Sequence, residues 1–158
     1  MELKVNQLVL ESLSEIETAA PAQLYDYWQQ KRDGRARPAW HDIELMDMWK
    51  IADVLAVKDA LHQDRDFRYR YWGSKHSDLA GFDGSGKTGT QILERAAFGH
   101  VFDSFWATID GAAPIRASGT LVTGESEKLA YEGIHLPLGD ADGAVGHLIS
   151  AYSYRPLA

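Results

Sequence analysis

The sequence predicts one α+β domain in which helices are inserted into an antiparallel sheet. The 158 residues are enough for one hydrophobic core and few for two. An apolar fraction of 45% and an aromatic fraction of 11% are typical of a folded globular chain. Segments with strand character lie on both sides of one long helical segment, without the strand–helix alternation of a parallel sheet.

The N-terminal part of the chain is predicted to be helical. In residues 5–16 the apolar side chains recur at helical spacing, although the run at residues 7–10 is also compatible with a strand. Pro21 suits the first turn of a second helix, which extends to about Arg32 and ends at Asp33 and Gly34. A short third helix, capped by Asp42, is expected at residues 43–49.

The rest of the chain is predicted to form hairpins around one long helix, residues 94–109. Its apolar stripe contains Phe98, Val101, Phe102, Phe105 and Ile109. The expected strands are residues 54–61, 67–72, 115–123, 129–136 and 145–154. In the second of these, Phe67, Tyr69 and Tyr71 alternate with arginines, so the aromatic rings are expected to share the core-facing side.

Charge and composition limit the expected partners and compartment. The net charge of -7 disfavours nucleic acid and anionic membranes as partners, because both bind basic surfaces. No apolar run approaches the roughly 18 residues that a membrane-spanning helix needs, and the first residues lack the features of a signal peptide. The absence of cysteine excludes disulfides, cysteine-based zinc sites and thiol nucleophiles. We expect a cytoplasmic protein without nucleic-acid or membrane partners.

Residues 81–88, Gly-Phe-Asp-Gly-Ser-Gly-Lys-Thr, match the P-loop pattern G-x-x-x-x-G-K-[ST]. A P-loop needs a buried strand before it and a helix after it, so that backbone N–H groups surround phosphate oxygens. The residues before Gly81 are too polar for such a strand, and Gly89 is a poor first residue for the helix. A nucleotide-binding protein that uses Gly81 to Thr88 is therefore the alternative hypothesis.

Several short motifs, taken in order, resemble the PAS-like sensory domain family of alphaproteobacteria. The central motif is Phe-Arg-Tyr-Arg-Tyr-Trp-Gly-Ser at residues 67–74, followed by Gly81 and by Gly-Lys-Thr at residues 86–88. Leu-Tyr-Asp-Tyr-Trp at residues 24–28 and Pro-Ala-Trp-His-Asp-Ile at residues 38–43 precede it, and His-Leu-Pro-Leu-Gly-Asp at residues 135–140 follows it. The resemblance covers residues 22–154.

This resemblance implies a PAS fold, a five-stranded antiparallel sheet with helices over one face that usually encloses a cavity. Residues 21–158 would form the PAS-like domain, and residues 1–20 an N-terminal helical extension. The family has no catalytic residues to carry over, so we expect no enzyme. The implied function is a sensory or protein-interaction domain that binds a small ligand or a partner. A signalling protein is a further expected partner, and the domain would signal through its N-terminal helices. Those helices would also form a homodimer.

A ligand is expected on the aromatic core side, against Tyr69, Tyr71, Phe98, Phe102 and Phe105. Its identity and any cofactor are unknown. Cysteine-linked chromophores are excluded because the chain has no cysteine. Haem-binding relatives use a histidine on the long helix, but His100 lies opposite the Phe stripe, so haem is not expected.

Two other chemistries remain to be weighed. A last hairpin centred on Ala141 would pair His135 with His147, but two histidines without an acidic partner are too few for a metal site. A small α+β dehydratase or isomerase would need a histidine and a carboxylate inside its cavity. The sequence does not pair His41, His62 or His76 with a particular acid.

Overall fold

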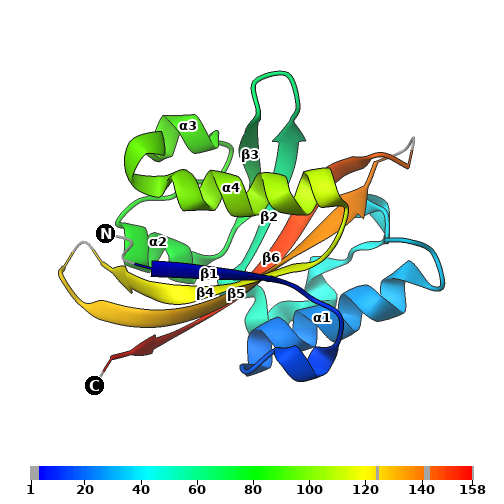
Figure 1. The fold of residues 1–158 in the computed structure, drawn as a ribbon, viewed down its shortest axis with the longest axis horizontal. Helices are drawn as coiled ribbons and strands as arrows, with labels where there is room; N and C mark the ends of the chain where they lie inside the picture. The colour runs from blue at the N-terminus through cyan, green and yellow to red at the C-terminus, as the bar shows by residue number, and fades with distance from the viewer. Residues whose placement is uncertain (1–3, 124, 141–142, 158) are drawn as a thin grey trace.

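A six-stranded antiparallel sheet, with strand order β1-β4-β5-β6-β2-β3, organises the computed structural model, which describes residues 4–123, 125–140 and 143–157 (Figure 1). The strands are β1 (Lys4–Val9), β2 (Leu55–Leu61), β3 (Asp66–Trp72), β4 (Ile115–Val122), β5 (Lys128–Gly139) and β6 (Val145–Pro156). Residues 1–3 of the predicted extension, and Ala141 and Asp142 of the predicted hairpin loop, lie outside the described residues.

Helices cover both faces of this sheet (Figure 1). The α-helices are α1 (Ala19–Arg32), α2 (Ser74–Ala80), α3 (Gly89–Ile92) and α4 (Arg95–Gly111), and short 3-10 helices occupy Leu13–Glu15, Trp40–Asp42 and Leu45–Val54. Helix α1 contacts one face of β5 and β6. Helix α4 contacts the other face of these two strands and also contacts β4. Strand β5 is therefore enclosed between two helical layers.

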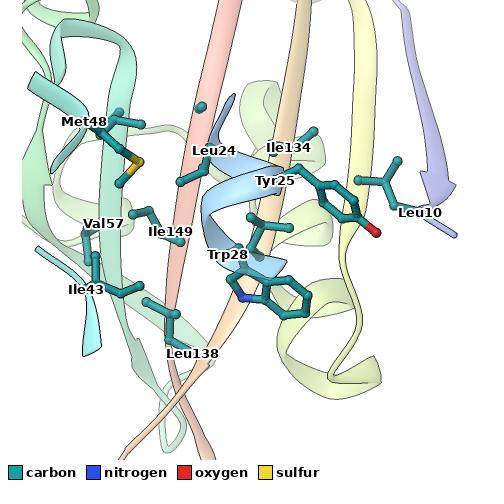
Figure 2. Close-up of a cluster of buried hydrophobic side chains, with 13 residues drawn as sticks. Leu10, Leu24, Tyr25, Trp28, Ile43, Met48, Val57, Ile134, Leu138 and Ile149 are labelled. Atoms are coloured by element: carbon teal, nitrogen blue, oxygen red, sulfur yellow. The ribbon is translucent and has the colours of Figure 1, made fainter. Parts of the chain in front are cut away.

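The side of the sheet that faces α1 is closely packed (Figure 2). Leu24 and Tyr25 both lie on the face of α1 that carries Trp28, because residues three and four positions apart are neighbours on a helix. They are 0%, 4% and 3% exposed and meet Ile134 of β5 and Ile149 of β6, which are 0% exposed. Each such side chain contributes about 1.5–3 kcal/mol by leaving water. This core holds α1 against the sheet.

A buried carboxylate fixes the start of α1. Glu132 of β5 is 4% exposed and accepts hydrogen bonds from the backbone N–H groups of Glu17 and Thr18, both at 2.9 Å. It also accepts from the Thr18 hydroxyl and, at 2.6 Å, from Nε of Arg116. Burial alone would raise the pKa of Glu132, but these hydrogen bonds outweigh burial and lower it. The ionised carboxylate thus satisfies N–H groups next to the first turn of the helix.

The α+β class and the antiparallel sheet are confirmed, but the helix predicted at residues 5–16 is wrong. Lys4–Val9 is a strand that pairs with β4, from Lys4 opposite Thr120 to Val9 opposite Ile115. The sheet consequently has six strands instead of five, and its helices lie on two faces instead of one. The free edge of β4 offers a row of hydrogen bonds, and this distant partner overrides the local helical spacing.

The predicted register of the last hairpin is also wrong. His135 pairs with Ser150, and His147 pairs with Leu138, so the two histidines lie on opposite faces of the sheet. Strand β5 continues to Gly139, beyond its predicted end, and a register shift separates Leu138 from Gly139.

The P-loop alternative is wrong as well, because residues 86–88 line the outer edge of β3. Gly86 N–H donates to the Tyr69 carbonyl at 2.8 Å, and Tyr69 N–H donates to the Lys87 carbonyl at 2.9 Å. Helix α2, and not a strand, precedes the motif, and α3 after it has only four residues. The motif therefore lacks the strand and long helix of a phosphate-binding loop, and the Gly86 N–H already has a partner.

The glycine that follows the motif has a packing role that can be tested. A Cβ at Gly89 would lie 2.6 Å from the Phe67 ring. We expect Gly89→Ala to lower the free energy of unfolding by about 1–3 kcal/mol through overpacking. Lys87→Ala removes an exposed side chain and should change the free energy of unfolding by less than about 0.5 kcal/mol. Urea denaturation measures both. An equal loss in the two variants would contradict this account of the motif.

The Glu132 contacts predict a pH-dependent contribution to stability. At pH 7, Glu132→Gln should lower the free energy of unfolding by about 2 kcal/mol, because hydrogen bonds to a charged group are lost. The pKa of Glu132 is lowered by folding, so its contribution is complete above the ordinary glutamate pKa and is lost as pH falls through the folded value. Urea titrations at decreasing pH should show this loss in the parent and not in Glu132→Gln. Glu127→Gln, at an exposed position, is the matched control and should behave as the parent.

Candidate functional site

A cavity of about 510 Å³ lies between helices α2 to α4 and the face of the sheet opposite α1. Its wall includes residues of all three helices, of strands β2 to β6 and of the segment between α2 and α3. Most of these side chains are apolar or aromatic. Phe82, which is 40% exposed, stacks on Trp72 at 5.8 Å between ring centroids, where the cavity meets the surface. Volumes of 300–1,000 Å³ are typical of small-molecule sites.

Tyrosines and histidines supply most of the polar groups of this wall: Tyr69, Tyr131, Tyr152, Tyr154, His76, His100 and His135. Burial raises the pKa of Tyr69, Tyr152 and Tyr154 above the ordinary value of 10.0. Their hydroxyls therefore stay protonated and can donate hydrogen bonds to a bound molecule.

The two buried histidines of the wall are neutral. His135 Nδ1 lies 2.7 Å from the Ser150 hydroxyl, and burial, assisted by the charge of Lys58, lowers the pKa of His135 to about 3. His76 Nδ1 lies 3.1 Å from the Tyr154 hydroxyl, and the same two causes lower the pKa of His76 to about 4. His76 Nε2 is buried near the Val54 and Leu55 backbone but makes no hydrogen bond of normal geometry.

Lys58 of β2 lies behind the aromatic wall and is 1% exposed. Its Nζ is 4.8 Å from the ring centroid of Phe67, 5.2 Å from that of Tyr69 and 5.9 Å from that of Phe105. Burial lowers the pKa of Lys58 to about 7. Among the described residues, no carboxylate forms an ion pair with this amine. The sequence analysis missed Lys58; the available signal was a lysine at an inward position of an apolar strand.

The structure distributes the five predicted ligand-contact residues over three places. Tyr69 and Phe98 line the cavity. Phe102 and Phe105 pack beside it against Phe67, at 5.1 and 4.9 Å between centroids. Tyr71 lies on the α1 side of the sheet, and its hydroxyl donates to the Ala52 carbonyl at 2.9 Å. Contact of these residues with a ligand stays a prediction.

A β-bulge explains why Tyr71 was misplaced. Val57 pairs with Tyr71 and the next residue, Lys58, pairs with Tyr69, so Arg70 is an extra residue in β3. Such an insertion reverses the alternation of side chains beyond it. Tyr69 and Tyr71 therefore face opposite sides, although they are two positions apart.

His100, which the sequence placed opposite the Phe stripe, is half-buried and lines the cavity. The cavity runs along the flank of α4 that carries His100 and Ser104, four residues apart, and not along the stripe of Phe102 and Phe105. His76, His100 and His135 are the histidines of the wall that could bind a metal ion or haem iron. Within the part of the chain that the structure describes, no three His, Asp or Glu side chains converge as a metal site.

The described wall contains no Asp or Glu, so it does not provide the histidine–carboxylate pair that a dehydratase or isomerase would need. His147 Nδ1 lies 2.8 Å from Asp59, but neither residue belongs to the wall. Nε of Arg70 also donates to Asp59 at 2.8 Å. Burial would raise the pKa of Asp59, but the interactions with His147 and Arg70 outweigh burial and lower this pKa. This arrangement is an ion-pair cluster outside the cavity.

Comparison with known proteins identifies the fold. No family model and no curated protein matches the sequence. An RNA-binding light-oxygen-voltage receptor aligns with a TM-score of 0.54 and 13% identity over 95% of this chain. VqmA bound to DPO aligns with a TM-score of 0.55 and 13% identity, and the Vibrio cholerae VqmA dimer with 0.55 and 12%, each over 72% of this chain. The chain spans 38%, 59% and 52% of those chains, respectively. The fold is PAS-like, as the sequence motifs indicated.

These comparisons correct the prediction that excluded nucleic acid. One of the matched structures is an RNA-binding receptor, and VqmA has been solved in a complex with ligand and DNA. The exclusion relied on the net charge of the whole chain, which does not describe a local basic surface or a neighbouring domain.

A separate finding concerns membranes: none of the helices in the described residues has the length and apolar character to cross one.

The two neutral histidines predict destabilisation by acid. An ordinary histidine has a pKa near 6.5, and folding lowers the pKa of His76 to about 4 and of His135 to about 3. The unfolded chain therefore binds more protons below pH 6.5, and each histidine should remove about 1.4 kcal/mol of stability per pH unit over the next two units. His135→Asn should reduce this slope in urea titrations from pH 7 to 5. His41→Asn, with a side chain 79% exposed, should leave it unchanged.

Proposed function

We propose that the chain is a non-catalytic sensory domain whose cavity binds a small aromatic molecule. The observation that carries this proposal is a largely apolar cavity of about 510 Å³ with protonated tyrosine hydroxyls in its wall. The apolar wall favours removal of rings from water, and the hydroxyls can fix the orientation of a polar substituent.

The shape of the wall favours a planar ligand. Tyr69 and Trp72 meet edge to face at 4.7 Å between centroids, and Tyr152 and Tyr154 stack at 5.9 Å. Rings in these orientations leave faces and edges against which another aromatic ring can pack. VqmA, which has the same fold, is described as bound to DPO, which supports a ligand-binding role for this fold.

We further propose that ligand binding is transmitted to α1, the N-terminal helix that contacts β5 and β6. Both strands line the cavity on one face and support α1 on the other. A ligand that prefers one position of these strands would shift the population of α1 positions without any chemical step. The motif resemblance to alphaproteobacterial PAS-like proteins supports the same sensory role.

Filling the cavity tests the ligand-binding part of this proposal. N-phenyl-1-naphthylamine, a neutral aromatic probe, should bind the parent protein with increased fluorescence. Ser104→Phe places a ring in the cavity wall and should weaken probe binding at least tenfold. Ala107→Phe, at an exposed position of the same helix, should bind as the parent does. Circular dichroism checks that both variants fold. Absence of probe binding to the parent, or equal binding by Ser104→Phe, would contradict the proposal.

A further inference from the structure

We infer that the cavity takes an aromatic acid, bound as its anion, and that Lys58 is the cationic group that attracts it. This inference rests on the proposed function and adds the chemical class of the ligand. Lys58 is a buried amine without a carboxylate partner among the described residues, beside a cavity whose described wall contains no Asp, Glu, Lys or Arg.

The first argument is the missing counter-ion. A buried ammonium is unfavourable unless an anion or several hydrogen-bond acceptors compensate for the lost water. The rings of Phe67, Tyr69 and Phe105 surround Nζ at 4.8–5.9 Å and provide cation–π attraction, which compensates only in part. A methionine or leucine would fill this position in a purely structural core. The ligand can supply the anion that the chain does not.

The second argument is the reach of this charge into the cavity. Tyr69, whose ring centroid lies 5.2 Å from the amine, is part of the wall. The positive charge of Lys58 also contributes to the lowered pKa values of His76 and His135, which line the cavity from α2 and β5. The same positive potential stabilises an anion in the cavity.

The third argument is that three tyrosines and two buried histidines of the wall are neutral near pH 7. Tyr69 on β3 and Tyr152 and Tyr154 on β6 have raised pKa values, so they are protonated donors. His76 and His135 have lowered pKa values, so they are uncharged. Helix α4 contributes Phe105 beside the amine, and His100 of the same helix also lines the cavity. The Lys58 amine changes charge near neutral pH, and an anionic ligand should favour its protonated form.

A pair of probes that differ by one sulfonate separates charge from shape. 8-Anilinonaphthalene-1-sulfonate is anionic throughout the working pH range, and N-phenyl-1-naphthylamine is its neutral counterpart. Fluorescence titration should give a Kd for the sulfonate probe that is at least tenfold higher in Lys58→Met than in the parent. The Kd of the neutral probe should change less than twofold. In the parent, the sulfonate probe should bind more weakly as pH rises from 6.5 to 8.5, and the neutral probe should not.

Controls show that the effect comes from this amine and this cavity. Lys58→Met should melt at or above the temperature of the parent, because an unpaired buried amine is removed. Lys50→Met, at an exposed lysine, should leave both Kd values unchanged. Ser104→Phe should weaken both probes if both occupy the cavity, and competition between the probes in the parent checks this directly.

The outcomes distinguish this inference from the proposed function. Equal binding of the sulfonate probe by the parent and Lys58→Met would overturn the inference, and so would equal weakening of both probes. Binding of the neutral probe alone would overturn the inference and leave the ligand-binding cavity intact. Failure of the parent to bind the neutral probe would overturn the proposed function itself.

Discussion

Burial of strand β5 on both faces is the constraint on which the rest of the structure depends. Ile134, Leu136 and Leu138 point towards α1, whereas the residues between them belong to the other side of the sheet. A strand in this position must provide two interiors with different properties from one alternating sequence. One interior is closely packed, and the other contains the cavity.

This division has energetic consequences. The core under α1 contributes apolar burial without buried charge, apart from the Glu132 contacts at its edge. The cavity side instead contains an unpaired amine, neutral histidines and phenols, each of which is less favourable in the interior than an apolar side chain of similar volume. The closed side therefore stabilises a fold in which the other side retains polar groups suited to binding.

Local patterns predicted the parts of the fold that depend on neighbouring residues. The aromatic stripe of α4, the hairpin of β2 and β3 and the α+β class follow from spacings within one segment. The strand Lys4–Val9 could not be predicted in this way, because its partner β4 is more than a hundred residues away. The bulge at Arg70 was equally hidden, since it depends on the register with β2.

The candidate site was predicted less completely than the fold. Tyr69 and Phe98 could be identified from their aromatic pattern, but the position of His100 depends on which flank of α4 borders the cavity. The role of the Gly-Lys-Thr segment also depends on a distant contact, the edge of β3. Lys58 was the strongest missed signal. A lysine at an inward strand position was visible, but its lack of a partner is a three-dimensional property.

Neighbouring residues of β5 give the sheet a mechanical link between its two sides. Tyr131 faces the cavity, and Glu132 on the opposite face holds the backbone of Glu17 and Thr18. A ligand that displaces this part of β5 must either stretch those hydrogen bonds or move the start of α1 with the strand. Thermodynamic linkage makes such a coupling reciprocal. A partner that holds α1 in one position would then change ligand affinity by the same factor by which the ligand changes affinity for that partner.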